Sequence, residues 1–241
     1  MKTKTFILST TIFLLTLSVT ACAQSKKTIS RNYDISSFNA ISADIVGNVI
    51  FTQSSTTSVS AEGEEEMVNN LIIKVENNTL KLSKKKNLKR IFGNRKATRL
   101  VVKISSPNLN RIESDGVGNI TLNGVVKTDN LYIKSDGVGN ISASQLECRQ
   151  LTIDSDGVGN TRLKGKGQFA EYKSDGVGNI DTREYIAEDV IVKLSGVGSI
   201  KCYASKNIEL SGSGVGSITY YGNPNIKALN KSGIGKISSG D

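Results

Sequence analysis

Residues 114–120 read Ser-Asp-Gly-Val-Gly-Asn-Ile, and this heptapeptide returns along the second half of the chain. Close copies begin at Ser135, Ser155 and Ser174, and weaker copies cover 195–200, 213–218 and 232–237. The first glycines of the seven copies are therefore 21, 20, 19, 20, 18 and 19 residues apart, at Gly116, Gly137, Gly157, Gly176, Gly196, Gly214 and Gly233. A period near 20 predicts a solenoid with one coil per copy.

Each copy lies within a stretch whose residues alternate in the manner of a β-strand. Around one copy the residues of one parity are Leu131, Ile133, Ser135, Gly137, Gly139, Ile141 and Ala143. We therefore predict an all-β fold, a single-stranded right-handed parallel β-helix with about 20 residues per coil. Equivalent residues of successive coils would then lie about 4.8 Å apart.

A charged position gives a separate test of this stacking. The residues three places before the first glycines are Glu113, Lys134, Asp154, Lys173 and Lys193. The first four alternate in sign, as neighbours in adjacent strands should.

The N-terminus has the features of a bacterial lipoprotein signal over residues 1–21. Lys2 and Lys4 precede a short apolar stretch, and Val19-Thr20-Ala21-Cys22 matches the lipobox, whose cysteine becomes the lipidated N-terminus. Cys22 would then anchor the protein in a membrane, with 22–30 as a tether. Ordinary signal cleavage is the alternative reading, because Ala21-Cys22-Ala23 also suits it.

Residues 31–104 are less regular and form, on this reading, the N-terminal β part of the same domain, with the repeats at 105–241. Residues 44–49 resemble a degenerate copy of the motif, 71–82 a hairpin around Asn77-Asn78, 62–70 a short helix and 100–104 a strand. Lys227, Lys231 and Lys236 occupy positions that are apolar or small elsewhere, so we expect a polar cap on the last coil.

The lipobox, the early Asp-Ile-Val-Gly-Asn-Val segment and the Ser-Asp-Gly-Val-Gly-Asn-Ile copies together resemble the head GIN domain family, described as auto-transporter adhesins. The resemblance covers about residues 35–237. It implies a parallel β-helix in the cell envelope of Gram-negative bacteria, and it brings no catalytic residues. A self-transporting protein also needs a C-terminal β-barrel, for which the residues after the last copy give no support.

The aspartates of the motif are the candidate metal ligands: Asp115, Asp136, Asp156 and Asp175. Carboxylates stacked about 4.8 Å apart repel by roughly 1 kcal/mol in water, so something must offset the repulsion. Bound Ca²⁺ is one candidate, and Lys134 and Lys173, two places back on the same face, are another. The favoured interpretation is a solvated file held by turn hydrogen bonds and charge pairs.

The other motif positions predict structure. Amides at strand spacing form hydrogen-bonded ladders, and glycine allows a close backbone approach. The predicted structural ladder consists of Gly116, Gly118, Asn119, Gly137, Gly139, Asn140, Gly157, Gly159, Asn160, Gly176, Gly178 and Asn179.

The valine of each copy is harder to place. Strict alternation puts Val117, Val138 and their equivalents outside with Asp and Asn, but glycine bends would allow them to turn inward. Because burying a valine is favourable by roughly 1.5 kcal/mol or more, we expect the valines to be buried. If they are exposed, they form an apolar stripe suited to binding.

Composition limits the chemistry. Lys and Arg exceed Asp and Glu by nine, and the chain has no His and no Trp, so the commonest general base and metal ligand is missing. A basic run suits anionic lipid, lipopolysaccharide or acidic polysaccharide, although such runs are usually solvated loops; it contains Lys84, Lys85, Lys86, Lys89, Arg90, Arg95, Lys96 and Arg99. Glu62, Glu64, Glu65 and Glu66 are the acidic counterpart. Nucleic acid is not an expected partner.

Cys148 and Cys202 differ in position within their coils and lie about three coils apart, so we expect free buried thiols. The sequence thus favours a non-catalytic lipoprotein of the cell envelope, anchored most simply in the outer membrane, that acts as an adhesin-like binding or scaffolding module. No cofactor is expected unless Ca²⁺ binds the aspartates. The alternatives are a polysaccharide-acting β-helix lyase or glycosidase and a Ca²⁺-binding structural solenoid. Which face of the membrane the protein occupies is left open.

Overall fold

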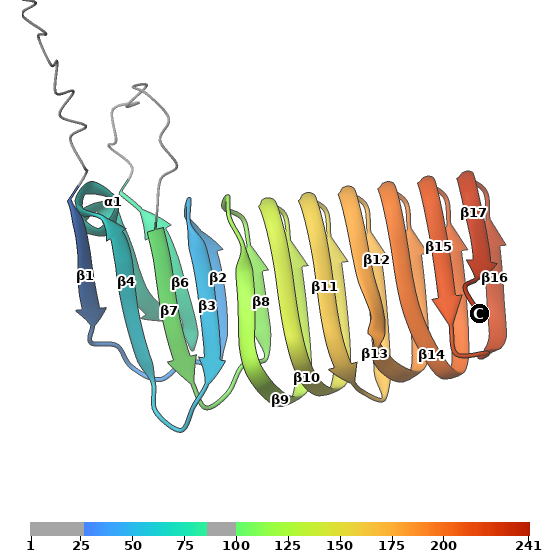
Figure 1. Ribbon diagram of the computed structural model, residues 1–241, viewed down its shortest axis with the longest axis horizontal. Coiled ribbons are helices and arrows are strands. Elements are labelled where there is room, and N and C mark those ends of the chain that lie inside the picture. The colour runs from blue at the N-terminus through green and yellow to red at the C-terminus, as the bar shows by residue number, and fades with distance from the viewer. Residues whose placement is uncertain (1–26, 86–99) are drawn as a thin grey trace, which may run out of the picture.

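The computed structural model describes residues 27–85 and 100–241, which form seventeen β-strands and one short α-helix joined by turns and loops (Figure 1). The N-terminal elements are β1 (Thr28–Tyr33), β2 (Ala40–Asp44), β3 (Asn48–Gln53), β4 (Ser58–Glu64), α1 (Glu65–Asn70), β5 (Leu71–Glu76), β6 (Thr79–Lys84) and β7 (Leu100–Ser106). The stack continues with β8 (Arg111–Ser114), β9 (Ile120–Ser135), β10 (Val138–Ser155), β11 (Val158–Lys166), β12 (Phe169–Ser174), β13 (Val177–Leu194), β14 (Val197–Gly212), β15 (Val215–Tyr221), β16 (Asn225–Lys231) and β17 (Ile234–Ser239).

Successive repeats stack in parallel and in register, as predicted. Gly139 pairs with Gly159, Gly159 with Gly178, and Gly178 with Gly198. The charged position also stacks, because Lys134 pairs with both Glu113 and Asp154. The chain is therefore a β-solenoid with roughly 20 residues per coil.

Each coil bends at fixed places instead of running straight. Along β13 and β14 the pairing shifts between Thr182 and Ile186 and again between Ala187 and Asp189. These shifts mark bends of the strand, and the Ser-Asp-Gly segment makes the remaining turn. The turn is hydrogen-bonded to the coil before it, since the Ser135 carbonyl accepts the amide N–H groups of Asp156 and Gly157 at 2.9 and 2.8 Å.

Inward-facing side chains form files through the interior. One file contains Ile120, Ile141, Thr161, Ile180, Ile200 and Ile218, all buried. Each aliphatic member stabilises the fold by roughly 1.5–3 kcal/mol relative to an exposed side chain. Tyr185, also fully buried, pairs with Gly165 of the preceding coil, so the largest side chain there lies beside a residue that has none.

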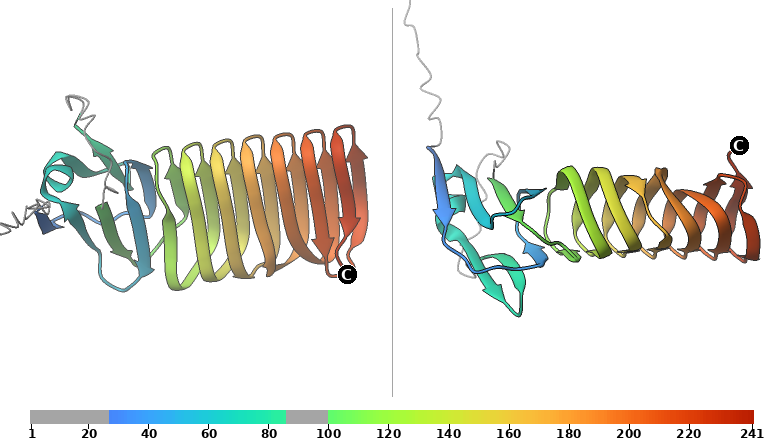
Figure 2. Two further views of the ribbon diagram at one scale, coloured as in Figure 1. Left: turned by 45° about the horizontal axis from the view of Figure 1, so that its top comes forward. Right: turned by 90° about the horizontal axis from the view of Figure 1, so that it is seen from below.

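The N-terminal part caps one end of the stack, and its strands diverge from the even coils (Figures 1 and 2). Residues 44–49 form the degenerate copy expected from the sequence, because Val46 bridges to Val117 and Val49 pairs with Ile120. The β5–β6 hairpin turns at Asn77 and Asn78, both with positive φ, as predicted. The predicted helix is shorter than 62–70, because residues 62–64 belong to β4, which pairs with β1 and β7.

At the opposite end, β16 and β17 form the last coil of the described residues (Figure 1). Leu229 is 50% exposed, although its partner Leu210 in the preceding coil is buried. Lys227, Lys231 and Lys236 are exposed on this last coil, where charge and hydration oppose further strand pairing. Among the described residues, no helix is long and apolar enough to cross a bilayer.

Candidate functional site

The glycines of the repeat determine which of its other side chains point outward. Gly118, Gly139, Gly159, Gly178 and Gly198 have φ between 146° and 155°, a region that is almost confined to glycine. A Cβ on Gly159 would lie 1.7 Å from the carbonyl oxygen of Gly139 in the preceding coil. The glycines thus allow the coils to approach while the strand stays extended and its side chains keep alternating.

Because Gly139, Gly159, Gly178 and Gly198 lie within extended strands, the valines beside them face outward. The expectation that they are buried was wrong. Eight apolar side chains lie in one file and are 41–77% exposed: Val46, Val117, Val138, Val158, Val177, Val197, Val215 and Ile234. We call the outward Asp/Ser, Val/Ile and Asn/Ser files of the seven copies the ladder face.

The asparagine file of this face is a continuous hydrogen-bonded ladder, as predicted. The Asn140 Nδ2 donates to Asn119 Oδ1 at 2.9 Å, and Asn160 and Asn179 repeat the bond at 3.1 and 2.8 Å. At the ends, Asn119 bonds to Asn48 and Ser199 bonds to Asn179. Because these side-chain amides hydrogen-bond to one another, the ladder fixes the spacing of the ladder face.

Lysines of the same face pair with Asp136 and Asp175, two of the four motif aspartates. Lys134 Nζ lies 2.5 Å from Asp136 Oδ2, and Lys173 Nζ lies 2.7 Å from Asp175 Oδ2 and 3.5 Å from Asp154 Oδ1. This is the charge pairing that the sequence favoured. No side chain of the four motif aspartates bonds a turn amide within the described residues.

The members of the aspartate file differ electrostatically. Partial burial raises the pKa of Asp156, with the Asp154 charge adding to the shift, whereas the hydrogen bond from Lys173 lowers the pKa of Asp175. Desolvation and the Asp136 charge raise the pKa of Asp115. Carboxylate oxygens of Asp154, Asp156 and Asp175 lie within 4.8 Å of one another, a donor set compatible with Ca²⁺. Asp154 was not among the predicted ligands, and calcium binding by the motif aspartates stays a prediction.

The other sequence-predicted sites are spread over the N-terminal part. Cys22 and six residues of the basic run lie outside the described residues: Lys86, Lys89, Arg90, Arg95, Lys96 and Arg99. Of the two that are described, Lys84 ends β6 and Lys85 Nζ donates to the Asn69 carbonyl at 3.1 Å. Glu62 and Glu65 pair with Lys103 and Lys27. The described partners of Glu62 and Glu65 thus lie outside the basic run.

Both described cysteines are free and buried, as predicted. Burial raises the pKa of Cys148 to about 11 and that of Cys202 to about 12. Neither thiol has the low pKa or the exposure that nucleophilic catalysis needs.

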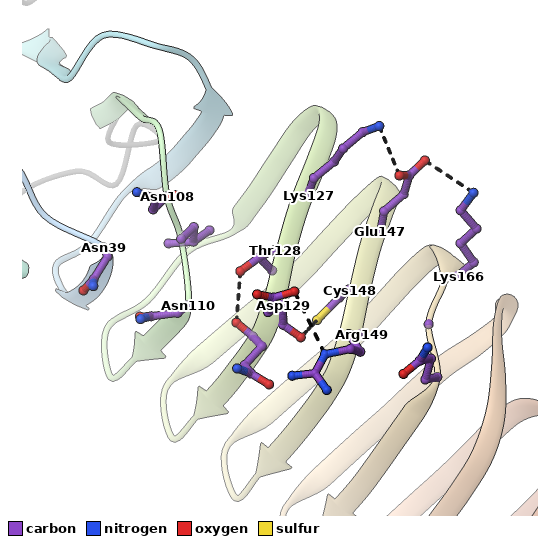
Figure 3. Close-up of a pocket in the computed structure, with 14 residues that line it drawn as sticks. Asn39, Asn108, Asn110, Lys127, Thr128, Asp129, Glu147, Cys148, Arg149 and Lys166 are labelled. Atoms are coloured by element: carbon purple, nitrogen blue, oxygen red, sulfur yellow. Dashed lines mark hydrogen bonds and ion pairs between the residues drawn. The ribbon is translucent and has the colours of Figure 1, made fainter.

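A groove that the sequence did not indicate lies outside the ladder face (Figure 3). We call it the junction groove. It has a volume of about 910 Å³ and lies between the loop 108–110, together with Asn39, and the bends 127–130, 147–149 and 166–168 of the first coils. Ion pairs between neighbouring coils run along one edge of it, where Glu147 contacts Lys127 at 3.2 Å and Lys166 at 3.7 Å (Figure 3).

The repeat pattern does not indicate the junction groove, because the residues of the groove come from the non-repeating parts of the coils. The one available signal was local, namely Asn108 and Asn110 in the loop that joins the N-terminal part to the repeats.

Known proteins share this architecture. A putative adhesin from Bacteroides fragilis NCTC 9343 is 41% identical, with a TM-score of 0.84 over 89% of this chain and 98% of that chain. A putative lipid binding protein from Parabacteroides distasonis ATCC 8503 is 21% identical, with a TM-score of 0.69 over 89% of this chain and 97% of that chain. A putative adhesin from Parabacteroides merdae ATCC 43184 is also 21% identical, with a TM-score of 0.65 over 89% and 97%. The similarity to the last two concerns the fold alone.

No curated protein matches significantly. The family model described as "Putative auto-transporter adhesin, head GIN domain" matches residues 37–224, which include the degenerate copy and all but the last repeat. Together with the 41% identity to the Bacteroides fragilis protein, this match shows that the chain belongs to the head GIN domain family.

Proposed function

We propose that this protein is a non-catalytic, adhesin-type binding module of the cell envelope, and that the ladder face is its contact surface for an extended glycan. The observation that carries the proposal is the exposed valine file. A soluble protein seldom exposes a continuous apolar surface without a use for it. Here eight apolar side chains, each at least 41% exposed, are aligned along the rod.

The chemistry of the ladder face suits a saccharide chain. Pyranose rings present C–H faces and hydroxyl edges, and the valine file lies between an amide file and an aspartate file. Lys134 and Lys173 neutralise part of the aspartate charge, so the net negative charge that faces a neutral glycan chain is reduced. Asn140 and Asn160 are locked by the ladder, and a rigid surface loses less conformational entropy on binding.

The arrangement of the ends fits attachment through the N-terminus. β1 lies at the capped end and β17 at the other end of the rod (Figure 1). A lipid on Cys22, six residues before β1 begins at Thr28, would hold the capped end near the membrane and direct the coils away from it. In a fractionation experiment, Cys22→Ala should move the protein from the membrane to the soluble fraction, and retention in the membrane would contradict lipid anchoring.

The ladder face is tested by glycan-array and titration measurements on the whole mature protein. A triple variant, Val138→Thr, Val158→Thr and Val177→Thr, keeps the side-chain shape and removes the apolar surface. We expect at least a ten-fold loss of glycan affinity and nearly unchanged thermal stability, because the three side chains are exposed. Val125→Thr with Ile186→Thr is the control, since both side chains are exposed outside the ladder face. The proposal would be overturned if the triple variant bound the glycan as tightly as the unchanged protein does. Binding of lipopolysaccharide through its lipid part alone would also overturn it.

One observation favours a second candidate, a polysaccharide-cleaving activity. The pKa values of Asp156 and Asp175 are shifted in opposite directions, as acid and base partners often are. A catalytic site needs one such pair at one place, whereas these residues belong to a repeated file. If a screen of acidic polysaccharides finds turnover that Asp156→Asn abolishes, the protein is an enzyme and the adhesin proposal is wrong.

A further inference from the structure

The junction groove has the size and position of a ligand site. Its volume of about 910 Å³ lies in the range of small-molecule sites. It is bounded by the loop after β7 and by bends of three successive coils (Figure 3). The ladder face does not contribute to it, so its function can be tested separately.

Five carboxamide side chains border this groove. Within residues 27–85 and 100–241, the side-chain amides make no hydrogen bond to the protein at Asn39, Asn108, Asn110, Asn130 and Gln168. The amides of the asparagine ladder, by contrast, are bonded to one another. Each free carboxamide offers two donors and an acceptor, which is the combination that pairs of sugar hydroxyl groups require.

The charged residues of the groove leave an excess of positive charge. Lys127 and Lys166 share the single carboxylate of Glu147. Arg149 lies 4.0 Å from Asp129, at the limit of an ion pair, and its side chain is 51% exposed. Three cations therefore face two carboxylates. The planar guanidinium of Arg149 remains able to bind a carboxylate with two parallel hydrogen bonds.

The lining is poorly suited to a lipid ligand and to covalent attack on a substrate. Leu109, the aliphatic side chain of the lining, is fully buried, so an acyl chain finds no apolar wall. Cys148 is also buried, and its thiol donates to the Gln150 carbonyl at 3.0 Å. The groove thus offers binding groups without an accessible nucleophile.

We infer that the junction groove binds a short acidic saccharide. Arg149 binds the sugar carboxylate, and Asn108, Asn110 and Asn39 bind hydroxyl groups on the N-terminal side of the groove. The site gives the protein a ligand that is independent of the glycan proposed for the ladder face.

The test is isothermal titration of the whole mature protein with tri-galacturonate, with neutral galactotriose as the uncharged probe of similar size. We expect saturable binding of tri-galacturonate and at least ten-fold weaker binding of galactotriose. Arg149→Gln, and separately Asn108→Ala with Asn110→Ala, should each weaken tri-galacturonate at least ten-fold. Arg149→Lys should bind more tightly than Arg149→Gln but less tightly than the unchanged protein, because lysine keeps the charge but lacks the two parallel N–H donors of the guanidinium.

Lys201→Gln is the matched control, since it removes one positive charge from the ladder-face side, next to the file of Ile200. Its affinity for tri-galacturonate should equal that of the unchanged protein, and so should that of the triple valine variant. Absence of binding at millimolar tri-galacturonate, or undiminished affinity in Arg149→Gln, would refute the inference. Arg149-dependent binding to phosphatidylglycerol vesicles without binding of tri-galacturonate would also refute it, in favour of a lipid headgroup.

Discussion

The hydroxyl group of Tyr185 donates a hydrogen bond of 2.7 Å to the main-chain carbonyl of Cys148. The two residues are 37 positions apart, and the bond passes Gly167, whose missing side chain leaves the space. A Cβ on Gly167 would lie 2.2 Å from the tyrosine hydroxyl and 2.3 Å from the Cys148 carbonyl oxygen. This bond thus ties coils together below the junction groove, where the repeat motif makes no contribution.

Replacing Tyr185 by Phe should lower the free energy of unfolding by about 1–3 kcal/mol, because a buried carbonyl loses its partner. Tyr172 is the matched control. It is equally buried, but its hydroxyl makes no hydrogen bond within the described residues. Tyr172→Phe should therefore be neutral or slightly stabilising. Urea unfolding of both variants measures the difference, and equal losses would show that the Tyr185 bond contributes nothing specific.

Alanine at a ladder glycine should be far more damaging than alanine at a glycine outside the ladder. In Gly159→Ala the new Cβ meets a carbonyl oxygen at 1.7 Å in a backbone conformation unsuited to L-residues. We expect a loss of more than about 3 kcal/mol, or failure to fold. Gly212→Ala meets its nearest atom at 3.5 Å, and thermal melting should show a change below about 1 kcal/mol. Similar melting temperatures for the two variants would contradict the close coil contact.

Two aspartates of the same file should respond oppositely to neutralisation. The pKa of Asp175 is lowered, so its carboxylate stabilises the fold at pH 7, and this contribution disappears as the pH falls below about 4. The pKa of Asp156 is raised, so its carboxylate destabilises the fold at pH 7 until protonation relieves it at low pH.

Asp175→Asn should therefore lose, and Asp156→Asn gain, a few tenths of a kcal/mol at pH 7, because solvent screens these exposed groups. Both differences should shrink as the pH falls below about 4, and that of Asp175→Asn disappears only below the lowered pKa of Asp175. Unfolding measured at pH 7 and pH 3 checks the signs. A stability change of the same sign in both variants at pH 7 would show that Lys173 does not discriminate between the two carboxylates.

The thiols of Cys148 and Cys202 should not react with a thiol reagent in the native protein. Both are buried, and their pKa values are raised to about 11 and about 12, so the reactive thiolate is scarce at pH 8. In a Cys22→Ala chain, we expect no fast labelling in buffer and two equivalents in denaturant. One or no equivalent in denaturant without reductant would indicate a disulfide, against the free thiols seen here.

Much of the architecture could be read from the repeat. The stacking of Gly139, Gly159 and Gly178, the asparagine ladder and the alternating charges at Glu113, Lys134 and Asp154 all follow from one period of about 20 residues. Strand pairing repeats the same hydrogen bonds in every coil, so identical residues recur wherever the same geometry recurs. Even the degenerate copy at 44–49 was visible for this reason.

The direction of the valines needed the backbone conformation. Burial energy argued for the inside, but it acts only if the strand can bend, and Gly159 and its equivalents keep the strand extended. The lysine pairing of the aspartate file was foreseen, whereas the inclusion of Asp154 beside Asp156 and Asp175 depended on side-chain reach.

By itself, the sequence determined the period, the register and the order of the files, because these arise from contacts that every coil repeats. The tertiary structure alone decided that the valines are exposed, that Tyr185 reaches Cys148, and that Asn39, Asn108 and Arg149 border one groove. The exposure of the valines follows from the backbone conformation at the neighbouring glycines. The Tyr185 bond and the groove, by contrast, join residues far apart along the chain and do not recur from coil to coil among the described residues. They depend on where the bends and the N-terminal cap bring the backbone, and no periodic pattern records that placement.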